Sequence, residues 1–248
     1  MNNIGLYIHI PFCRKKCAYC DFVSFAGCEQ DAFEQYFKAL FREIDLISPM
    51  LPKKEFETVF IGGGTPSLLP AGTPSVLAPD YLCQIINGAK STFLTDVAEI
   101  TVECNPFSLG DEFLEKVSEC KVNRLSIGLQ SANDGERRIL GRRAGKSEVQ
   151  SVVSRAKKAG INNISLDVML GVPGQTKESL KSTLDFCISS GVPHLSCYIL
   201  KIEENTPFFR MRDKLPFPSD DDTADMYLFM CEYLEEHGIM QYEISNFA

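Results

Sequence analysis

Tryptophan is absent from the sequence, and histidine occurs only three times in 248 residues. Basic residues are also outnumbered, since 25 Lys and Arg stand against 33 Asp and Glu and give a formal net charge of -8. This balance argues against a nucleic-acid duplex held mainly through its phosphates, because that mode needs clustered cations. No apolar run approaches the length of a membrane span, and the first residues lack the basic region and cleavage site of a secretory signal. We therefore expect a cytoplasmic protein whose partners are small molecules or other proteins.

Apart from these scarce residue types, the composition is that of an ordinary globular protein. Hydrophobic residues make up 44% of the chain and charged residues 23%, and the length suffices for a sizeable core. Short apolar runs rich in β-forming residues alternate with amphipathic stretches, which predicts βα units and a mostly parallel sheet. Six or seven such repeats favour an α/β barrel, closed or incomplete, over a doubly wound sheet. Strands are predicted near residues 4–10, 57–61, 98–103, 123–128, 162–168 and 194–199.

Two helices are clearly marked. Ser147 and Gln150, three residues further on, have the pattern of a capping box, and Gly160 stands where that helix would end. Thr176 is expected to cap the second helix and Gly191 to end it. The two apolar stripes with helical spacing are Val149, Val152, Val153 and Ala156 in the first helix, and Leu180, Thr183, Leu184, Cys187 and Ile188 in the second.

The remaining chain gives weaker signals. A last helix is expected over residues 220–238, after which Tyr242, Glu243 and Ile244 can open another strand. Two proline-rich stretches, residues 70–79 and 201–219, show no clear periodicity and are predicted to be irregular. Neither has the composition of a linker between domains.

Three cysteines directly after the first predicted strand, Cys13, Cys17 and Cys20, form the pattern C-x3-C-x2-C. Structural zinc sites use four ligands, and no nearby Cys or His supplies an obvious fourth. Three thiolates on a [4Fe-4S] cluster leave one iron open for a small-molecule ligand. The alternative is three inert thiols. In a reducing compartment we expect no disulfides, so that burial accounts for the other cysteines: Cys28, Cys83, Cys104, Cys120, Cys187, Cys197 and Cys231.

The cysteine loop, with Tyr19 between its last two cysteines, resembles the radical S-adenosylmethionine (SAM) superfamily. The longer string YIHIPFC…CAYCDF is similar to the oxygen-independent coproporphyrinogen III oxidase family with its heme-chaperone relatives, and the likeness extends to the terminal YEISNFA. This resemblance implies an incomplete (β/α) barrel of the radical SAM type, with residues 1–248 as its core domain and the family's C-terminal domain absent. It also implies a [4Fe-4S] cluster whose open iron holds SAM, with the cofactor supplying the radical chemistry.

Further candidate residues lie at the carboxyl ends of predicted strands, which is where the active sites of α/β barrels lie. Glycines in Gly62-Gly63-Gly64-Thr65-Pro66 permit close approach of the backbone to a ligand, although a plain tight turn has the same composition. Glu103 ends the third predicted strand and can accept hydrogen bonds from a ribose or an ammonium group, although a solvated glutamate is the simpler interpretation. The resemblance implies SAM-binding roles for Tyr7, Gly63, Gly64, Thr65, Glu103, Gln130, Arg142 and Asp167.

Arg142 has the clearest physical role among these residues, because its planar fork suits a carboxylate, and Arg143 is its local competitor. In the oxidases, the matched positions can serve a second SAM molecule. The three histidines, His9, His194 and His237, are expected to be satisfied by hydrogen bonds rather than to act as ligands. His9, next to the cysteine loop, is the one that merits a test.

Two branches of the family remain in competition. The oxidases carry a fourth cysteine two residues after the third, where this chain has Phe22, and an N-terminal extension before Tyr7. Both departures favour the heme-chaperone branch, for which the resemblance implies heme as cargo, a recipient hemoprotein and a reductant such as flavodoxin or ferredoxin. The first alternative is the oxidase itself, which acts on coproporphyrinogen III in porphyrin biosynthesis. The second is an iron-sulfur electron-transfer protein without SAM.

Overall fold

A computed structural model describes residues 4–50, 56–67, 77–93 and 99–248. The chain divides into two compact units. The first comprises residues 1–16, 22–125 and 155–161, and the second comprises residues 17–21, 126–154 and 162–248. The chain therefore passes from one unit to the other within the cysteine loop, between Cys13 and Cys17.

The sheet of the first unit has three parallel strands in the order β1 (Ile4–Ile10), β4 (Phe56–Gly63) and β5 (Glu99–Cys104). Buried side chains such as Ile61 and Val102 line one face of these strands, whereas Tyr7 on the other face of β1 is exposed. Two short strands, β2 (Phe12–Cys13) and β3 (Phe25–Ala26), pair in parallel beside the cysteine loop.

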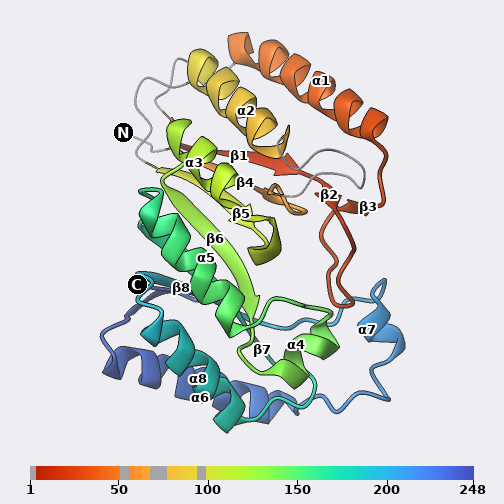
Figure 1. Ribbon diagram of the computed structural model, residues 1–248. Helices are drawn as coiled ribbons and strands as arrows, with labels where there is room; N and C mark the ends of the chain where they lie inside the picture. The colour runs from red at the N-terminus through yellow and green to blue at the C-terminus, as the bar shows by residue number, and fades with distance from the viewer. Residues whose placement is uncertain (1–3, 51–55, 68–76, 94–98) are drawn as a thin grey trace. The chain divides into compact units, whose positions relative to one another are not determined.

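Helices α1 (Gln30–Ile47), α2 (Leu77–Phe93) and α3 (Asp111–Glu119) belong to the first unit, with α2 lying between the other two (Figure 1). Aromatic side chains join α1 to α2, since the rings of Phe37 and Tyr81 stack with their centroids 4.7 Å apart. Two 3₁₀ helices, Ser48–Met50 and Pro106–Ser108, complete this unit.

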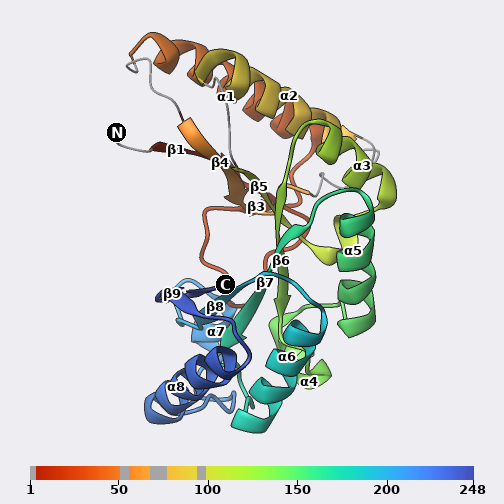
Figure 2. The same cartoon turned by 90° about the vertical axis from the view of Figure 1, so that its left-hand side faces the viewer.

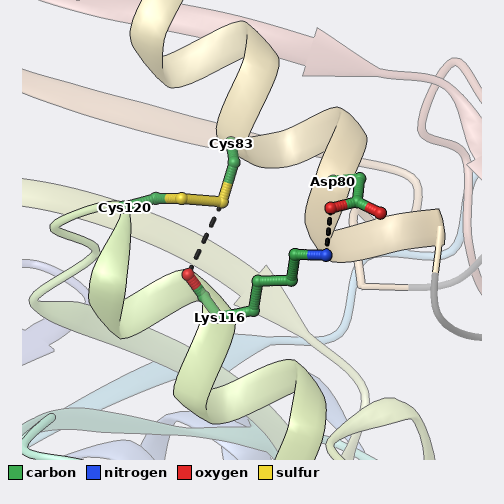
Figure 3. The surroundings of a disulfide bond; sticks show 4 residues. All are labelled: Asp80, Cys83, Lys116 and Cys120. Atoms are coloured by element: carbon green, nitrogen blue, oxygen red, sulfur yellow. Dashed lines mark hydrogen bonds and ion pairs between the residues drawn. A yellow bond between two sulfur atoms is a disulfide. The ribbon is translucent and has the colours of Figure 1, made fainter.

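A disulfide between Cys83 of α2 and Cys120 at the end of α3 overturns the expectation that none of the cysteines would be paired (Figure 3). The packing of the two helices brings the Cα atoms to 5.5 Å, within the range that a disulfide spans. An ion pair between Lys116 and Asp80 joins the same helices. The spacing of cysteines along the sequence contains no trace of this proximity.

The second unit contains β6 (Arg124–Gln130), whose first two residues belong to the first unit, followed by β7 (Asn163–Leu170) and β8 (His194–Ile199). Strands β7 and β8 are parallel. The last two strands, β10 (Asn246–Phe247) and β9 (Gln241–Glu243), continue this sheet in antiparallel orientation. The six predicted strands are confirmed, with shifts of up to two residues at their ends, and the expected strand at Tyr242 ends one residue earlier, at Glu243.

The second half of the chain contains the helices α4 (Asp134–Leu140), α5 (Lys146–Lys158), α6 (Lys177–Ser189), α7 (Pro207–Arg210) and α8 (Asp220–Glu236). Helices α6 and α8 lie side by side over β7 (Figure 2). Thr176 caps α6 through a capping box with Ser179, and Gly191 has a φ of +62°, both as expected of the start and end of this helix. The α8 prediction is also confirmed.

The predicted start of α5 is wrong in one respect. Ser147 lies inside the helix rather than capping it, because the Glu148 carboxylate accepts hydrogen bonds from both Gly145 N–H (2.9 Å) and the Ser147 hydroxyl (3.0 Å). Glu148 thus takes the part predicted for Gln150, because its carboxylate accepts from the N–H of the residue that precedes the helix. The predicted apolar stripe of α5 is buried throughout, and Gly160 follows the helix with a φ of +90°.

The two stretches predicted to be irregular differ in outcome. Residues 70–76 lie outside the described residues, and residues 77–79 are the first turn of α2. The second stretch is mostly loop but contains the single turn of α7. No helix in the described parts of the chain is long and apolar enough to cross a membrane.

Candidate functional site

The glycine motif at the end of β4 is shaped by contacts that admit no side chain. A Cβ atom on Gly63, whose φ is +112°, would lie 2.5 Å from the imidazole ring of His9. A Cβ atom on Gly64 would lie 2.5 Å from the carbonyl oxygen of Phe12. Backbone hydrogen bonds from Gly64 to Ile10 (2.8 Å) and from Thr65 to Phe12 (2.8 Å) tie the motif to the strand that leads into the cysteine loop. The motif therefore packs directly against the strand before the cysteine loop, which a plain tight turn does not require.

Glu103 at the end of β5 is fixed against the same motif. Its Oε2 accepts a hydrogen bond of 3.0 Å from Gly63 N–H, and a Cβ atom on Gly62 would lie 2.9 Å from that oxygen. The side chain is partly buried. The interpretation of Glu103 as a freely solvated glutamate is therefore wrong, because its carboxylate is held in one orientation beside the glycines.

His9 connects these strands to the segment that follows the cysteine loop. Its Nε2 lies 2.8 Å from the carbonyl oxygen of Val23, which requires Nε2–H to donate. Nδ1 is then the acceptor for the Tyr7 hydroxyl at 2.9 Å. Burial raises the pKa of Tyr7, and the charge of Glu103 acts in the same direction. The expectation of a hydrogen-bonded histidine is confirmed here, as it is for His194 and His237.

Cys13 lies beside the glycine motif. Its Sγ is 3.8 Å from the Thr65 hydroxyl, and the β2–β3 pairing places Ala26 opposite it. The thiol is partly buried and unpaired with any other cysteine. Within the first unit, the structure therefore gathers Tyr7, Cys13, Gly63, Thr65 and Glu103 around the ends of β1, β4 and β5.

The rest of the cysteine loop belongs to the second unit. Cys17 and Cys20 close a tight turn, with Cys20 N–H 3.2 Å from the carbonyl oxygen of Cys17. Phe208 of α7 anchors this turn, because its N–H donates to Ala18 at 3.0 Å and its ring packs on Tyr19. Sequence reasoning missed Phe208, for which the only available signal was its place in an apolar Pro-Phe-Phe stretch within a polar region.

The guanidinium of Arg142, for which the sequence suggested a carboxylate partner, binds the hydroxyl of Tyr19. Its Nε and Nη2 donate to the Tyr19 hydroxyl at 3.2 and 2.9 Å. Burial raises the pKa of Tyr19 despite this cation. Burial also lowers the pKa of Arg142, but Tyr19, Cys17 and Asp167 outweigh it and raise the pKa of the guanidinium. Arg143, its competitor in sequence, is exposed.

Gln130 and Asp167 lie in the same part of the second unit. A Cβ atom on Gly128 would lie 3.0 Å from the Gln130 amide nitrogen and 3.4 Å from the Arg142 guanidinium. Gln130 is buried with a φ of +69°, a conformation that costs energy in a non-glycine residue and often marks functional sites. Asp167 accepts a hydrogen bond of 2.9 Å from Ser126. Gln130 and Arg142 thus lie against the same glycine, and the charge of Asp167 acts on Arg142.

The thiols of the cysteine loop are the candidate ligands of a metal centre. Within the described residues, no three His, Cys, Asp or Glu side chains converge on one metal position. A cluster needs no such convergence, because its thiolates bind different irons. Cys13, Cys17 and Cys20 form no disulfide and are partly exposed, whereas burial raises the pKa of Cys187 and Cys197 and so disfavours their thiolates.

The sequence matches the radical SAM superfamily over residues 7–187, which covers every residue predicted from the sequence to bind the cluster or SAM. The chain belongs to this superfamily. It is 36% identical over 244 residues to the heme chaperone HemW of Bacillus subtilis, and 36% identical over 246 residues to the zebrafish Danio rerio protein named radical S-adenosyl methionine domain-containing protein 1, mitochondrial. These matches cover 98% of this chain but 62% and 54% of the two relatives, so the chain spans little more than half of their length.

The fold matches a solved structure, the coproporphyrinogen III oxidase HemN of Escherichia coli, which its description calls a radical SAM enzyme. The TM-score is 0.86 at 25% identity, over 99% of this chain and 55% of that one. This confirms the predicted fold class, an incomplete α/β barrel of mostly parallel strands.

Proposed function

We propose that this chain is the radical SAM core of a cytoplasmic heme chaperone, with residues 1–248 acting as one domain. The observation that carries the cofactor assignment is the contact of the glycine motif with the cysteine loop and with Glu103. The Thr65 hydroxyl lies 3.8 Å from the Cys13 thiol, and Gly63 N–H donates to Glu103 at 3.0 Å. The similarity to HemW supports the heme-chaperone assignment.

In this proposal Cys13, Cys17 and Cys20 hold a [4Fe-4S] cluster through three of its irons. When bound, the cluster and SAM together supply one-electron cleavage of the sulfonium. The chain's own contribution is to hold the three thiolates. Thr65 neighbours Cys13, while Phe208 and Arg142 fix the turn between Cys17 and Cys20.

The residues of the first unit would bind the methionine end and the sugar of SAM. Gly63 and Gly64 leave backbone groups accessible at close range, and the remaining acceptor capacity of Glu103 suits an ammonium or hydroxyl group. Tyr7, through His9, connects this surface to the segment after the cysteine loop. In the second unit we assign Gln130, Arg142 and Asp167 to the same cofactor. Arg142 also holds the cysteine loop through its hydrogen bonds to Tyr19.

Heme is the proposed cargo and a hemoprotein the proposed recipient. The matching fold of HemN supports a second candidate, oxidation of coproporphyrinogen III. Phe22 weighs against it, because the oxidases have a fourth cysteine at this position. An iron-sulfur protein that does not bind SAM is disfavoured by the glycine motif, whose geometry a pure electron carrier does not require.

Anaerobic reconstitution followed by three measurements tests the proposal. We expect about four irons per chain, a change in the EPR spectrum of the reduced cluster on addition of SAM, and saturable heme binding. Incubation with coproporphyrinogen III should give no decarboxylated product. Product formation would favour the oxidase, and an EPR spectrum unaffected by SAM would contradict the radical SAM assignment for this site.

A further inference from the structure

The cysteine loop carries the only run of three consecutive basic residues in the sequence, Arg14-Lys15-Lys16. All three side chains are exposed, in a chain whose net charge is -8. In the parts of the chain that the structure describes, none of the three forms an ion pair. Lys16 is held in place instead, because its Nζ donates to the carbonyl oxygen of Phe22 at 3.0 Å. The first unit therefore presents a local positive surface against the charge of the whole chain.

Large apolar side chains adjoin these cations and are also exposed. The exposed fractions are 64% for Phe22, 69% for Val23 and 58% for Phe25. Adjacent exposed apolar side chains of this size are typical of interaction sites rather than of ordinary surface. We call the combined set the loop surface; it consists of Arg14, Lys15, Lys16, Phe22, Val23 and Phe25.

The backbone of the loop surface is fixed at several points. Phe25 N–H donates to the carbonyl oxygen of Pro11 at 2.7 Å, and the carbonyl oxygen of Val23 accepts from His9 at 2.8 Å. The exposure of these side chains is therefore not the result of a loose segment. A preformed surface loses little conformational freedom on binding, which favours association with a partner.

The loop surface lies directly beside a proposed ligand of the cluster. In the β2–β3 pair, Phe25 lies opposite Phe12 and Ala26 lies opposite Cys13. Neighbouring strands are about 4.8 Å apart, so a protein resting on Phe25 comes close to Cys13. Arg14 follows Cys13 in the chain and Lys16 precedes Cys17, which places each of these cations one residue from a ligand.

We propose that the loop surface is the docking site of an acidic one-electron carrier protein, of the flavodoxin or ferredoxin class. This inference rests on the proposed function, in which the cluster must receive one electron for each SAM cleaved. The donor loses one electron and the cluster gains it, and no bond forms or breaks in this step. Electron-transfer encounters use small interfaces with complementary charge, which matches a basic triplet beside a few apolar side chains.

Binding is measured first, with the cluster-loaded protein and an oxidised flavodoxin at low ionic strength. The variant Arg14→Gln/Lys15→Gln leaves the hydrogen bond of Lys16 intact and should raise the Kd about tenfold, with a smaller dependence of Kd on salt. The matched control is Lys157→Gln/Lys158→Gln, which removes two cations from the end of α5 and should leave the Kd unchanged. If both variants weakened flavodoxin binding equally, the effect would come from net charge alone and the proposal would be overturned.

The apolar part is tested with Phe22→Ser against Leu228→Ser, which removes a side chain of similar exposure, 60%, from α8. Only Phe22→Ser should weaken flavodoxin binding. Weaker hemin binding by the loop variants, with unchanged flavodoxin binding, would assign this surface to a porphyrin and contradict us.

Measuring how fast the cluster is reduced distinguishes a wrong docking site from a wrong proposed function. Flavodoxin hydroquinone should reduce the Arg14→Gln/Lys15→Gln variant about tenfold more slowly than the unchanged protein, whereas photoreduced deazariboflavin, a small neutral donor, should reduce both at the same rate. If deazariboflavin reduces the cluster but the two proteins respond equally to flavodoxin, the docking site is wrong and the proposed function stands. If no reducible cluster forms in the unchanged protein, both fail.

Discussion

The imidazole of His9 fills the space in which a side chain on Gly63 would lie, at a distance of 2.5 Å from the position of its Cβ atom. The two residues belong to adjacent strands, and each constrains the other. Gly63 has a φ of +112°, and His9 holds the segment after the cysteine loop through Val23. Changes in the glycine motif should therefore reach the cysteine loop through this histidine.

The first prediction concerns Gly63→Ala. The positive φ alone should cost about 1–3 kcal/mol of unfolding free energy, and displacement of the His9 ring should add to this cost. We expect weaker SAM binding together with faster loss of the cluster, measured by calorimetric titration and by iron content over time. In a double-mutant cycle, His9→Ala should lessen the effect of Gly63→Ala, since it removes the clash but not the backbone strain. Strict additivity of the two changes would contradict the contact.

A second prediction separates Arg142 from its neighbour. Arg142→Lys replaces a planar fork with a single ammonium group and should release Tyr19, so that the reconstituted protein loses iron several-fold faster. Tyr19→Phe should have a similar effect, and the double variant should be little worse than either single variant. Arg143→Lys, at the exposed position next in the chain, serves as the control and should retain its cluster. Normal iron retention in Arg142→Lys would show that Arg142 does not support the loop.

The cluster ligands give a third prediction. Replacing Cys13, Cys17 or Cys20 by Ala should remove most of the iron and the broad visible absorption of the reconstituted protein. Cys28→Ala is the matched control, because Cys28 is also a partly exposed free thiol shortly after the loop. Loss of iron in Cys28→Ala, with retention in the other three variants, would require a different set of ligands.

A fourth prediction follows from the disulfide. Air-oxidised protein, denatured without reductant and freed of iron, should show eight reactive thiols rather than ten, because Cys83 and Cys120 are paired. A loop of this length stabilises a protein by about 2–4 kcal/mol, so Cys83→Ser should lower the thermal midpoint under oxidising conditions. Addition of reductant should remove the difference between the variant and the unchanged protein. A reductant effect of equal size in Cys83→Ser would contradict the assignment.

The strands could be predicted because their signal is local. Runs of β-forming apolar residues between turns located β1 and β8 with their observed bounds, and the strand ends that carry the candidates Gly63 and Glu103 lie side by side. Contacts between distant parts of the chain have no such signal. Arg142 and Tyr19 are 123 residues apart, and Cys83 and Cys120 are 37 apart, so neither pair could be read from spacing. The predicted cap of α5 was wrong for a smaller reason, since the helix begins one residue before Ser147 and Glu148, rather than Gln150, accepts from the residue that precedes the helix.

The disulfide also closes a covalent ring that includes β5 and with it Glu103. A protease cut anywhere between Cys83 and Cys120 would break the backbone without separating the two fragments, which would migrate together on a gel until reductant was added. The strand that carries a proposed SAM contact is thus retained on the molecule even after its connection to α2 or α3 has been severed.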